Sequence, residues 1–160
     1  MTNEPIATPS GLTEPVLPTV TDGNRPFWEA GLAGELRFQR CAACGHLRYP
    51  ISTTCPKCLS RDASWVPVSG RGRVLTYAVF DRAYHPSREG RIPYVVALVQ
   101  LEEGPRMFGD LVDAAPADVA VGTPLVVTFD PSPDGTFAIP RFRLARDAAG
   151  HADGTPAAGG

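Results

Sequence analysis

The 160-residue sequence has no long apolar run, no basic N-terminal segment and no excess of positive charge. Its most apolar stretch, YVVALVQL, is followed at once by EEGP and is far shorter than the roughly 18 residues that a membrane-spanning helix needs. The first twenty-four residues contain neither lysine nor arginine, so we expect no secretory signal and a cytoplasmic protein. A net charge of -2 and a pI near 5.9 disfavour nucleic-acid binding, which usually involves a basic surface.

Cysteine is scarce, and all four cysteines lie in one stretch, RCAACGHLRYPISTTCPKCLS. They form two Cys-x-x-Cys pairs, for which a metal site, two disulfides and redox-active dithiols compete. A cytoplasmic protein rarely keeps structural disulfides. A redox dithiol needs a following helix, whereas Gly45 and Pro50 interrupt the chain after the first pair. Two such pairs on a short loop are typical of a zinc ribbon, in which four thiolates complete a closed tetrahedral shell. We therefore predict a structural zinc site, with iron as the open alternative, whose ligands are Cys41, Cys44, Cys55 and Cys58.

Short elements are predicted on both sides of the cysteines. In DGNRPFWEAGLAG, Pro26 suits the first turn of a helix and two glycines mark its end, so we expect a helix of about two turns. Its apolar side is predicted either to pack against the chain itself or to bind a partner subunit. That side consists of Phe27, Trp28 and Leu32. The stretches ELRFQRC and SWVPV read as strands that enter and leave the ribbon.

From Gly70 onward the predicted elements are mostly strands. RVLTYAVFD, PYVVALVQLE and RMFGDLV are rich in branched and aromatic residues, and Gly109 in the third marks a bulge or a close backbone approach. DAAPADVAVG predicts a helical turn. PLVVTFD and TFAIPRFR flank PSPDG, whose Asp134-Gly135 step is a hairpin signal. Three strands, a helical connector and a hairpin suit a five-stranded OB barrel.

The predicted fold class is therefore mainly β, with a short N-terminal helix, a rubredoxin-like zinc ribbon and then a five-stranded OB-fold barrel. We expect a flexible tail at residues 1–24, the helix and zinc ribbon at 25–68, the OB fold at 69–146 and a second flexible tail at 147–160.

Several motifs in a fixed order resemble a known family. PFWEAGLAGELRFQRCAACGHLRYP, the CPKC pair, SGRGRVLTYAVFDRAYHP, IPYVVALVQLEEGPRMFGDLVD and the closing IPRFR are similar to the zinc-ribbon and OB-fold proteins that accompany thiolases and related acyl-CoA enzymes. The resemblance implies a non-catalytic accessory subunit that binds a thiolase-fold partner. Such partners include thiolases, hydroxymethylglutaryl-CoA synthase and the lipid-transfer-type aldolases of steroid side-chain degradation. It also implies that a coenzyme A thioester is bound jointly with that partner.

The residues offer little for independent catalysis. Every cysteine is assigned to the metal, so no thiol remains for a thiolase-type nucleophile. His85 is the best acid-base candidate, but a lone loop histidine more often bonds locally or lines an interface. Its loop is the most basic part of the chain, and we predict that it faces a ligand passage or coenzyme A. The residues that carry this prediction are Arg82, His85, Arg88, Arg91 and Tyr94.

The alternative to an accessory subunit is a nucleic-acid-binding module, because OB barrels and zinc ribbons both serve that purpose. Its stacking face would consist of Tyr77, Phe80, Tyr94 and Phe108. Aromatic residues within strands, however, usually fill a barrel core. A stand-alone small enzyme is the third interpretation, and it lacks a plausible nucleophile.

Overall fold

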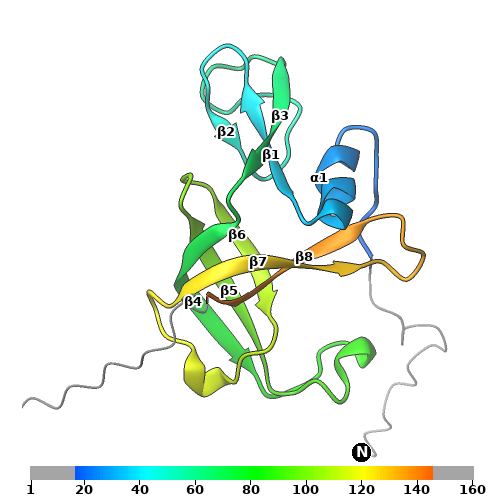
Figure 1. The fold of residues 1–160 in the computed structure, drawn as a ribbon, viewed down its shortest axis with the longest axis vertical. Helices are drawn as coiled ribbons and strands as arrows, with labels where there is room; N and C mark the ends of the chain where they lie inside the picture. Colours follow the sequence, from blue (N-terminus) through cyan, green and yellow to red (C-terminus); the bar gives the residue numbers. More distant parts are fainter. Residues whose placement is uncertain (1–16, 146–160) are drawn as a thin grey trace, which may run out of the picture.

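The computed structural model describes residues 17–145, which form a small β ribbon and a β barrel with a short helix beside both (Figure 1). Most of the tail predicted at 1–24, and all of the tail predicted at 147–160, lies outside the described residues. Between residues 17 and 145, no helix has the length and apolar character needed to cross a membrane.

The predicted short helix is present. α1 (Arg25–Ala30) continues into the 3-10 turn η1 (Gly31–Ala33) and stops at Gly34, whose φ of 73° lies in the left-handed region that glycine adopts without strain. Asn24 occupies the N-cap position, but its side-chain oxygen accepts a hydrogen bond from the Thr21 backbone N–H at 2.7 Å. Asn24 therefore closes the turn before the helix and does not cap the helix itself.

A three-stranded antiparallel sheet carries the cysteines. β1 (Leu36–Cys41) is central and pairs with β2 (Leu47–Arg48) on one side and β3 (Ala63–Val68) on the other. β1 and β3 are the predicted strands that enter and leave the ribbon. The two-residue β2 is too short to have been identified from alternation.

The second unit is a closed five-stranded barrel, as predicted. Its strand order is β4-β5-β6-β8-β7, and the connector before β7 contains the 3-10 turn η3 (Pro116–Asp118). β6 and β8 lie parallel, with Leu111 opposite Phe142, and this contact closes the barrel. The strands are β4 (Arg71–Phe80), β5 (Tyr94–Leu101), β6 (Arg106–Leu111), β7 (Pro124–Pro131) and β8 (Ala138–Leu144).

Side chains from every barrel strand fill the barrel. On β5 every second residue points inward, so Val95, Ala97, Val99 and Leu101 are buried. Gly109 on β6 gives the close approach predicted from its position, because a Cβ there would lie 2.6 Å from the ring of the fully buried Phe142. The barrel core is therefore aliphatic around one central phenylalanine.

Helix α1 and η1 link the ribbon to the barrel. Phe27 lies 6.5 Å from Phe38 of β1, measured between ring centroids, while Trp28 lies 6.0 Å from Phe137, the residue just before the barrel's final strand. Gly31 fits against Phe129 of β7, whose ring would lie 2.8 Å from an added Cβ. These contacts fix the ribbon relative to the barrel.

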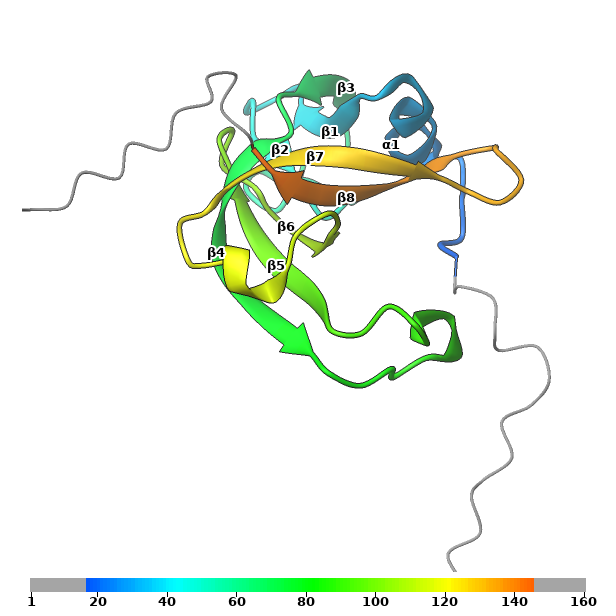
Figure 2. The ribbon, with the colours of Figure 1, turned by 60° about the horizontal axis from the view of Figure 1, so that its bottom comes forward.

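One strand leaves the barrel incompletely covered. β4 pairs with β7 only through residues 71–73, and beyond Val74 it pairs with β5 alone. A bulge between Val74 and Thr76 changes its course at this point. Figure 2 shows the far halves of β4 and β5 running away from β7 and β8 toward the loop that joins them, which contains the 3-10 turn η2 (Pro86–Arg88).

Candidate metal centre and partner-facing surfaces

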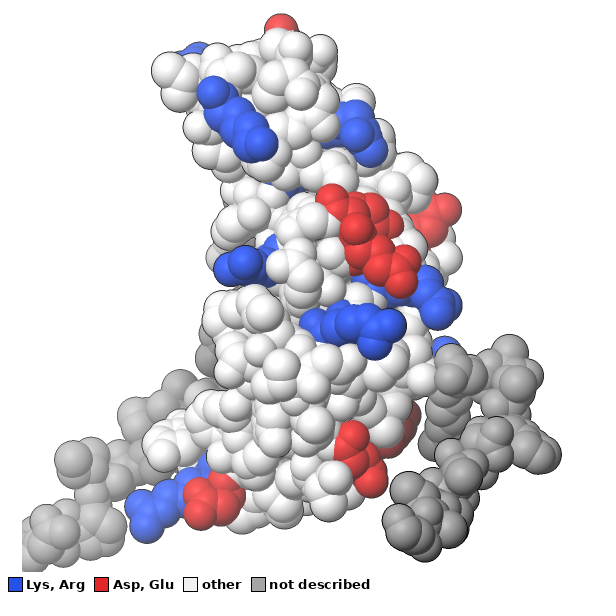
Figure 3. All heavy atoms as spheres, turned by 90° about the vertical axis from the view of Figure 1, so that its left-hand side faces the viewer, with Lys and Arg blue, Asp and Glu red and all other residues white. Residues whose placement is uncertain are grey.

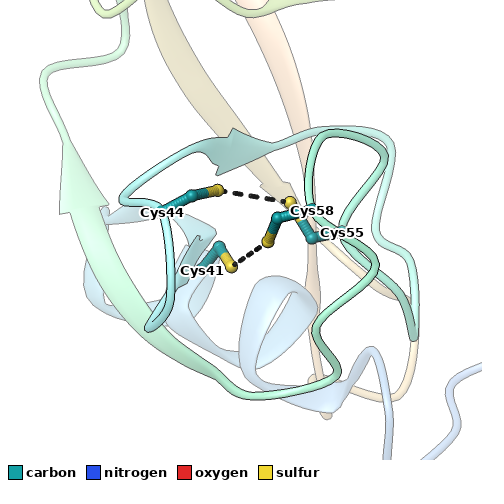
Figure 4. A group of neighbouring side chains, drawn as sticks. All are labelled: Cys41, Cys44, Cys55 and Cys58. Atoms are coloured by element: carbon teal, nitrogen blue, oxygen red, sulfur yellow. Dashed lines mark hydrogen bonds between the residues drawn. The ribbon is translucent and has the colours of Figure 1, made fainter.

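The four cysteine thiols lie together, as the spacing predicted. Each Sγ is within 4.8 Å of the other three, and the Cys41–Cys58 and Cys44–Cys55 pairs are 3.5 and 3.6 Å apart (Figure 4). A tetrahedral zinc ion with Zn–S bonds of about 2.3 Å requires S···S distances of roughly 3.8 Å. The cluster therefore has the donor type and the size for one such ion. His46 is outside this cluster, and its carbonyl accepts a hydrogen bond from the Cys41 N–H at 3.0 Å.

Two equivalent backbone turns hold the thiols. In the first, the Gly45 N–H donates to the Cys41 carbonyl at 2.9 Å, and in the second the Leu59 N–H donates to the Cys55 carbonyl at the same distance. Both turns end with a positive φ, 73° at Gly45 and 63° at Leu59. A leucine in this region is strained. Leu59 is also 76% exposed, so packing does not offset that strain.

Backbone dipoles favour the thiolate form in the cluster. Hydrogen bonds from the backbone N–H groups, first that of Cys44 and then that of Ala43, lower the pKa of Cys41 to about 6. Metal ligation requires the thiolate, so the first turn prepares its cysteine for a cation.

The helix residues predicted to bind a partner divide into two groups. Phe27 is 4% exposed and belongs to the chain's own core, and Trp28 packs against that core. Only Leu32, at 49% exposed, remains open to a partner. The structure thus shows the self-packing alternative for Phe27 and Trp28, and partner binding by the helix stays a prediction that rests on Leu32.

The predicted ligand-facing residues lie on or beside the β4–β5 loop, where two of them come into contact. The Arg88 guanidinium lies 4.8 Å above the centre of the Tyr94 ring, which in turn stacks on Phe80 at 4.9 Å. His85 turns inward along the loop, because its Nδ1 accepts a hydrogen bond from the Ser87 N–H and lies 2.8 Å from the Ser87 hydroxyl.

The remaining two loop arginines, Arg82 and Arg91, are exposed. Among residues 17–145 neither has a carboxylate within ion-pair distance. They are therefore the loop cations whose charge is available to a ligand or partner.

An anchor for this loop was not predicted from the sequence. Asp110 on β6 accepts a hydrogen bond from Arg88 at 2.6 Å and another from Arg141 of β8, and Arg141 also donates to Asp130 at 3.2 Å. Asp110 is only 12% exposed. Its one carboxylate thereby connects the loop with two barrel strands, and only the cross-strand register brings these residues together.

The aromatic residues of the alternative stacking face do not fill the barrel core. Tyr77 is 37% and Phe108 is 68% exposed, while Phe80 and Tyr94 are half-buried against one another. Thr76, Ala78 and Leu98 complete a groove of about 240 Å³ with Phe80 and Phe108. On the side shown in Figure 3, a broad area of the barrel carries no charged side chains. No lysine or arginine lines the groove beside Phe108, so this groove is not basic.

The two domains match known family models. Residues 28–63 match the rubredoxin-like zinc ribbon domain of ChsH2, and residues 65–130 match the C-terminal OB-fold domain of ChsH2. The chain is 40% identical over 128 residues to the probable enoyl-CoA hydratase alpha subunit of Thermomonospora curvata, an alignment that covers 80% of this chain and 39% of the relative. It is 43% identical over 108 residues to the 3-oxo-4,17-pregnadiene-20-carboxyl-CoA hydratase alpha subunit of Mycobacterium tuberculosis, covering 68% of this chain and 34% of the relative. The chain thus spans little more than a third of these curated relatives.

A solved structure, the Ltp2-ChsH2(DUF35) aldolase, contains a similar chain. The two chains superpose with a TM-score of 0.71 at 39% identity, and the match covers 80% of this chain and 98% of the other. A more distant relative, at 28% identity over 60% of this chain and 59% of its own length, is the benzoylsuccinyl-CoA thiolase subunit BbsA of Thauera aromatica. This chain matches the two domain models one after the other, and it matches nearly the whole of a solved relative. The chain therefore belongs to the ChsH2 (DUF35) family of zinc-ribbon and OB-fold proteins.

Proposed function

We propose that this chain is a non-catalytic accessory subunit that binds a thiolase-fold acyl-CoA enzyme, such as a thiolase, an acyltransferase or a retro-aldolase acting on coenzyme A thioesters. The observation that carries the proposal is the match over 98% of the ChsH2 chain in a solved aldolase complex. The thiolase-subunit relative supports the same class of partner. Steroid or lipid side chains are the substrates that the hydratase and aldolase relatives suggest for the partner.

The residues support a partner that performs the chemistry. All four thiols of the chain belong to the metal cluster, so none is left as a nucleophile. The imidazole of His85 interacts with its neighbour Ser87 in the loop. In contrast, nucleic-acid binding gains no support from the groove beside Phe108, because no charged residue lines it.

The Ltp2 subunit of the solved aldolase is the first partner to test. We expect the two proteins to co-purify when co-expressed, and the partner to lose activity or stability without this chain. The isolated, metal-replete chain should not turn over an acyl-CoA thioester. Turnover by the isolated chain, abolished by a single substitution, would refute the accessory role.

We further propose that Cys41, Cys44, Cys55 and Cys58 hold one structural zinc ion. Four thiolates leave no open coordination position, so the ion would stabilise the ribbon without taking part in a reaction. Elemental analysis of freshly purified, reduced protein should find one zinc per chain. Cys44→Ser should unfold the ribbon and reduce the stability of the barrel much less, as measured by hydrogen exchange in each unit. Thr53→Ser in the same loop is the control and should change the exchange of neither unit. Protein that is folded and free of metal would contradict this assignment.

The β4–β5 loop is proposed to face the passage of the coenzyme A thioester. Arg82 and Arg91 would contact phosphate groups, because their guanidinium groups have no carboxylate partner within residues 17–145. Arg88 would position the loop through Asp110, with His85 and Tyr94 lining the passage.

Arg82→Ala and Arg91→Ala should therefore raise the KM of the assembled complex for an acyl-CoA by about fivefold to tenfold with little change in kcat. Arg25→Ala is the matched control, because Arg25 at the start of α1 already pairs with the carboxylates of Asp22 and Glu29. An unchanged KM in an intact complex would remove the loop from the passage.

A further inference from the structure

The second half of β4 is an apolar strand edge without a neighbour among residues 17–145. From Leu75 to Phe80 the strand pairs only with β5, so alternate backbone N–H and C=O groups face away from the sheet. Leu75, Tyr77 and Val79 are 38%, 37% and 45% exposed. No charged residue and no proline lies between Arg73 and Asp81, although soluble proteins commonly place such residues on an open edge to prevent pairing. The edge therefore has the properties of a strand that pairs with another chain.

We infer that this edge pairs with the same edge of a second copy of this chain, antiparallel across a two-fold axis. In such a pairing about an axis perpendicular to the sheet, opposed residues must point to the same face. The axis therefore passes between the two copies of one residue. We place it at Ala78, one of the two central residues of the segment, because Tyr77 is then opposed by a β-branched residue. Tyr77 then faces Val79 of the other copy, and Thr76 faces its Phe80.

These pairs are favourable in a sheet. Aromatic side chains opposite β-branched ones stabilise antiparallel strands, and both Tyr77–Val79 contacts are of this kind. The absence of charge in the segment means that no like charges are opposed. Both faces of the strand would lose exposed apolar surface on pairing.

The regions that flank the edge are also complementary. The connector residue Gly122 donates its N–H to the Val74 carbonyl at 2.8 Å, which places the connector beside the start of the exposed edge. Next to it, Val121 is 69% exposed, and on the β4–β5 loop at the other end Tyr84 and Ile92 are 75% and 46% exposed. Antiparallel pairing brings each copy's loop next to the other copy's connector. Exposed apolar residues therefore meet in both symmetry-related contacts.

The first measurement is the mass of the full chain in solution. Sedimentation equilibrium should show twice the 17.0 kDa of one chain, with dissociation on dilution. Val79→Glu and Tyr77→Lys each bury an unpaired charge at the axis, so each should raise the dimer dissociation constant by about 100-fold or more. Both positions are exposed in the single chain, so circular dichroism should show that both variants remain folded. Leu59→Glu, on the exposed tip of the ribbon, is the matched control and should leave the dimer unchanged.

Mixing the two monomeric variants tests the register. In the proposed pairing, Lys at position 77 of one chain faces Glu at position 79 of the other, and the opposite contact remains Val79 with Tyr77. The mixture should therefore form a heterodimer, although neither variant forms a homodimer. A wild-type monomer at all concentrations would overturn the proposal, as would variants that dimerise like wild type or a mixture that stays monomeric. If the wild type is monomeric and the edge variants weaken only the complex with Ltp2, the edge belongs to the interface with the enzyme partner. That outcome would also overturn the proposed dimer.

Discussion

Asp110→Asn should loosen the β4–β5 loop more than its position on β6 would suggest. The substitution keeps the shape of the side chain but removes the charge shared by Arg88 and Arg141. Arg141 keeps the carboxylate of Asp130 at 3.2 Å, whereas Arg88 keeps no carboxylate partner and retains its contact with the ring of Tyr94 and, at most, a neutral amide acceptor. The loss of stability should therefore be greatest in the β4–β5 loop.

The magnitude follows from burial. A hydrogen bond to a charged group contributes about 1.5–3 kcal/mol when it is shielded from water, and exposed ion pairs contribute at most about 1 kcal/mol. The Arg88 and Asp110 side chains are 28% and 12% exposed, and Arg141 is 18% exposed. Because the amide oxygen of asparagine can still accept a hydrogen bond, we expect a loss of about 2 kcal/mol in the free energy of unfolding. The melting temperature should fall by roughly 6–10 °C.

Urea denaturation gives the global loss, and hydrogen exchange over residues 86–91 reports the loop. Glu102→Gln is the control, because Glu102 forms a salt bridge with Arg71 at 3.6 Å in which both side chains are more than half exposed. It should cost less than about 0.5 kcal/mol. A double-mutant cycle with Arg88→Gln isolates the coupling of the loop to Asp110. Equal effects of the two acid substitutions, or unchanged exchange in the loop, would refute the reasoning.

Two further outcomes follow from local geometry. Gly109→Ala should cost about 1–3 kcal/mol in urea unfolding through its clash with Phe142, and Phe142→Leu should relieve part of that cost in the double variant. Leu59→Gly should stabilise the ribbon by about 1 kcal/mol against thermal unfolding, because glycine adopts its φ of 63° without strain; a loss of stability would show that this strain is absent.

The features that local sequence determines could be predicted. The spacing of the cysteines indicates the metal cluster, since each Cys-x-x-Cys turn is built by neighbouring backbone groups. The Asp134-Gly135 step indicates the final hairpin, and Gly135 has the positive φ of 69° that such a turn requires. The close approach at Gly109 could also be predicted, because a glycine inside a strand usually marks a bulge or a close contact.

The features that depend on contacts between residues far apart in the sequence could not be predicted. The joining of Arg88 and Arg141 through Asp110 requires the register of three strands, which no local pattern contains. The burial of Phe27 beside an exposed Leu32 depends on where α1 meets β1. The uncovered edge of β4 follows from the point at which β7 departs, whereas its sequence is that of an ordinary buried strand.

The position of α1 also constrains the order in which the chain can fold during synthesis. The helix and η1 emerge early, yet Gly31 packs against Phe129 and Ala138, which belong to the last two strands described. A helix this short has little stability before its packing partners exist. The ribbon can form around its cysteines soon after translation, but the N-terminal helix must wait for the final hairpin. Until then Trp28, whose aromatic partner is Phe137, remains available to chaperones, so a ribosome paused before β8 should present a ribbon whose helix is not yet docked on the barrel.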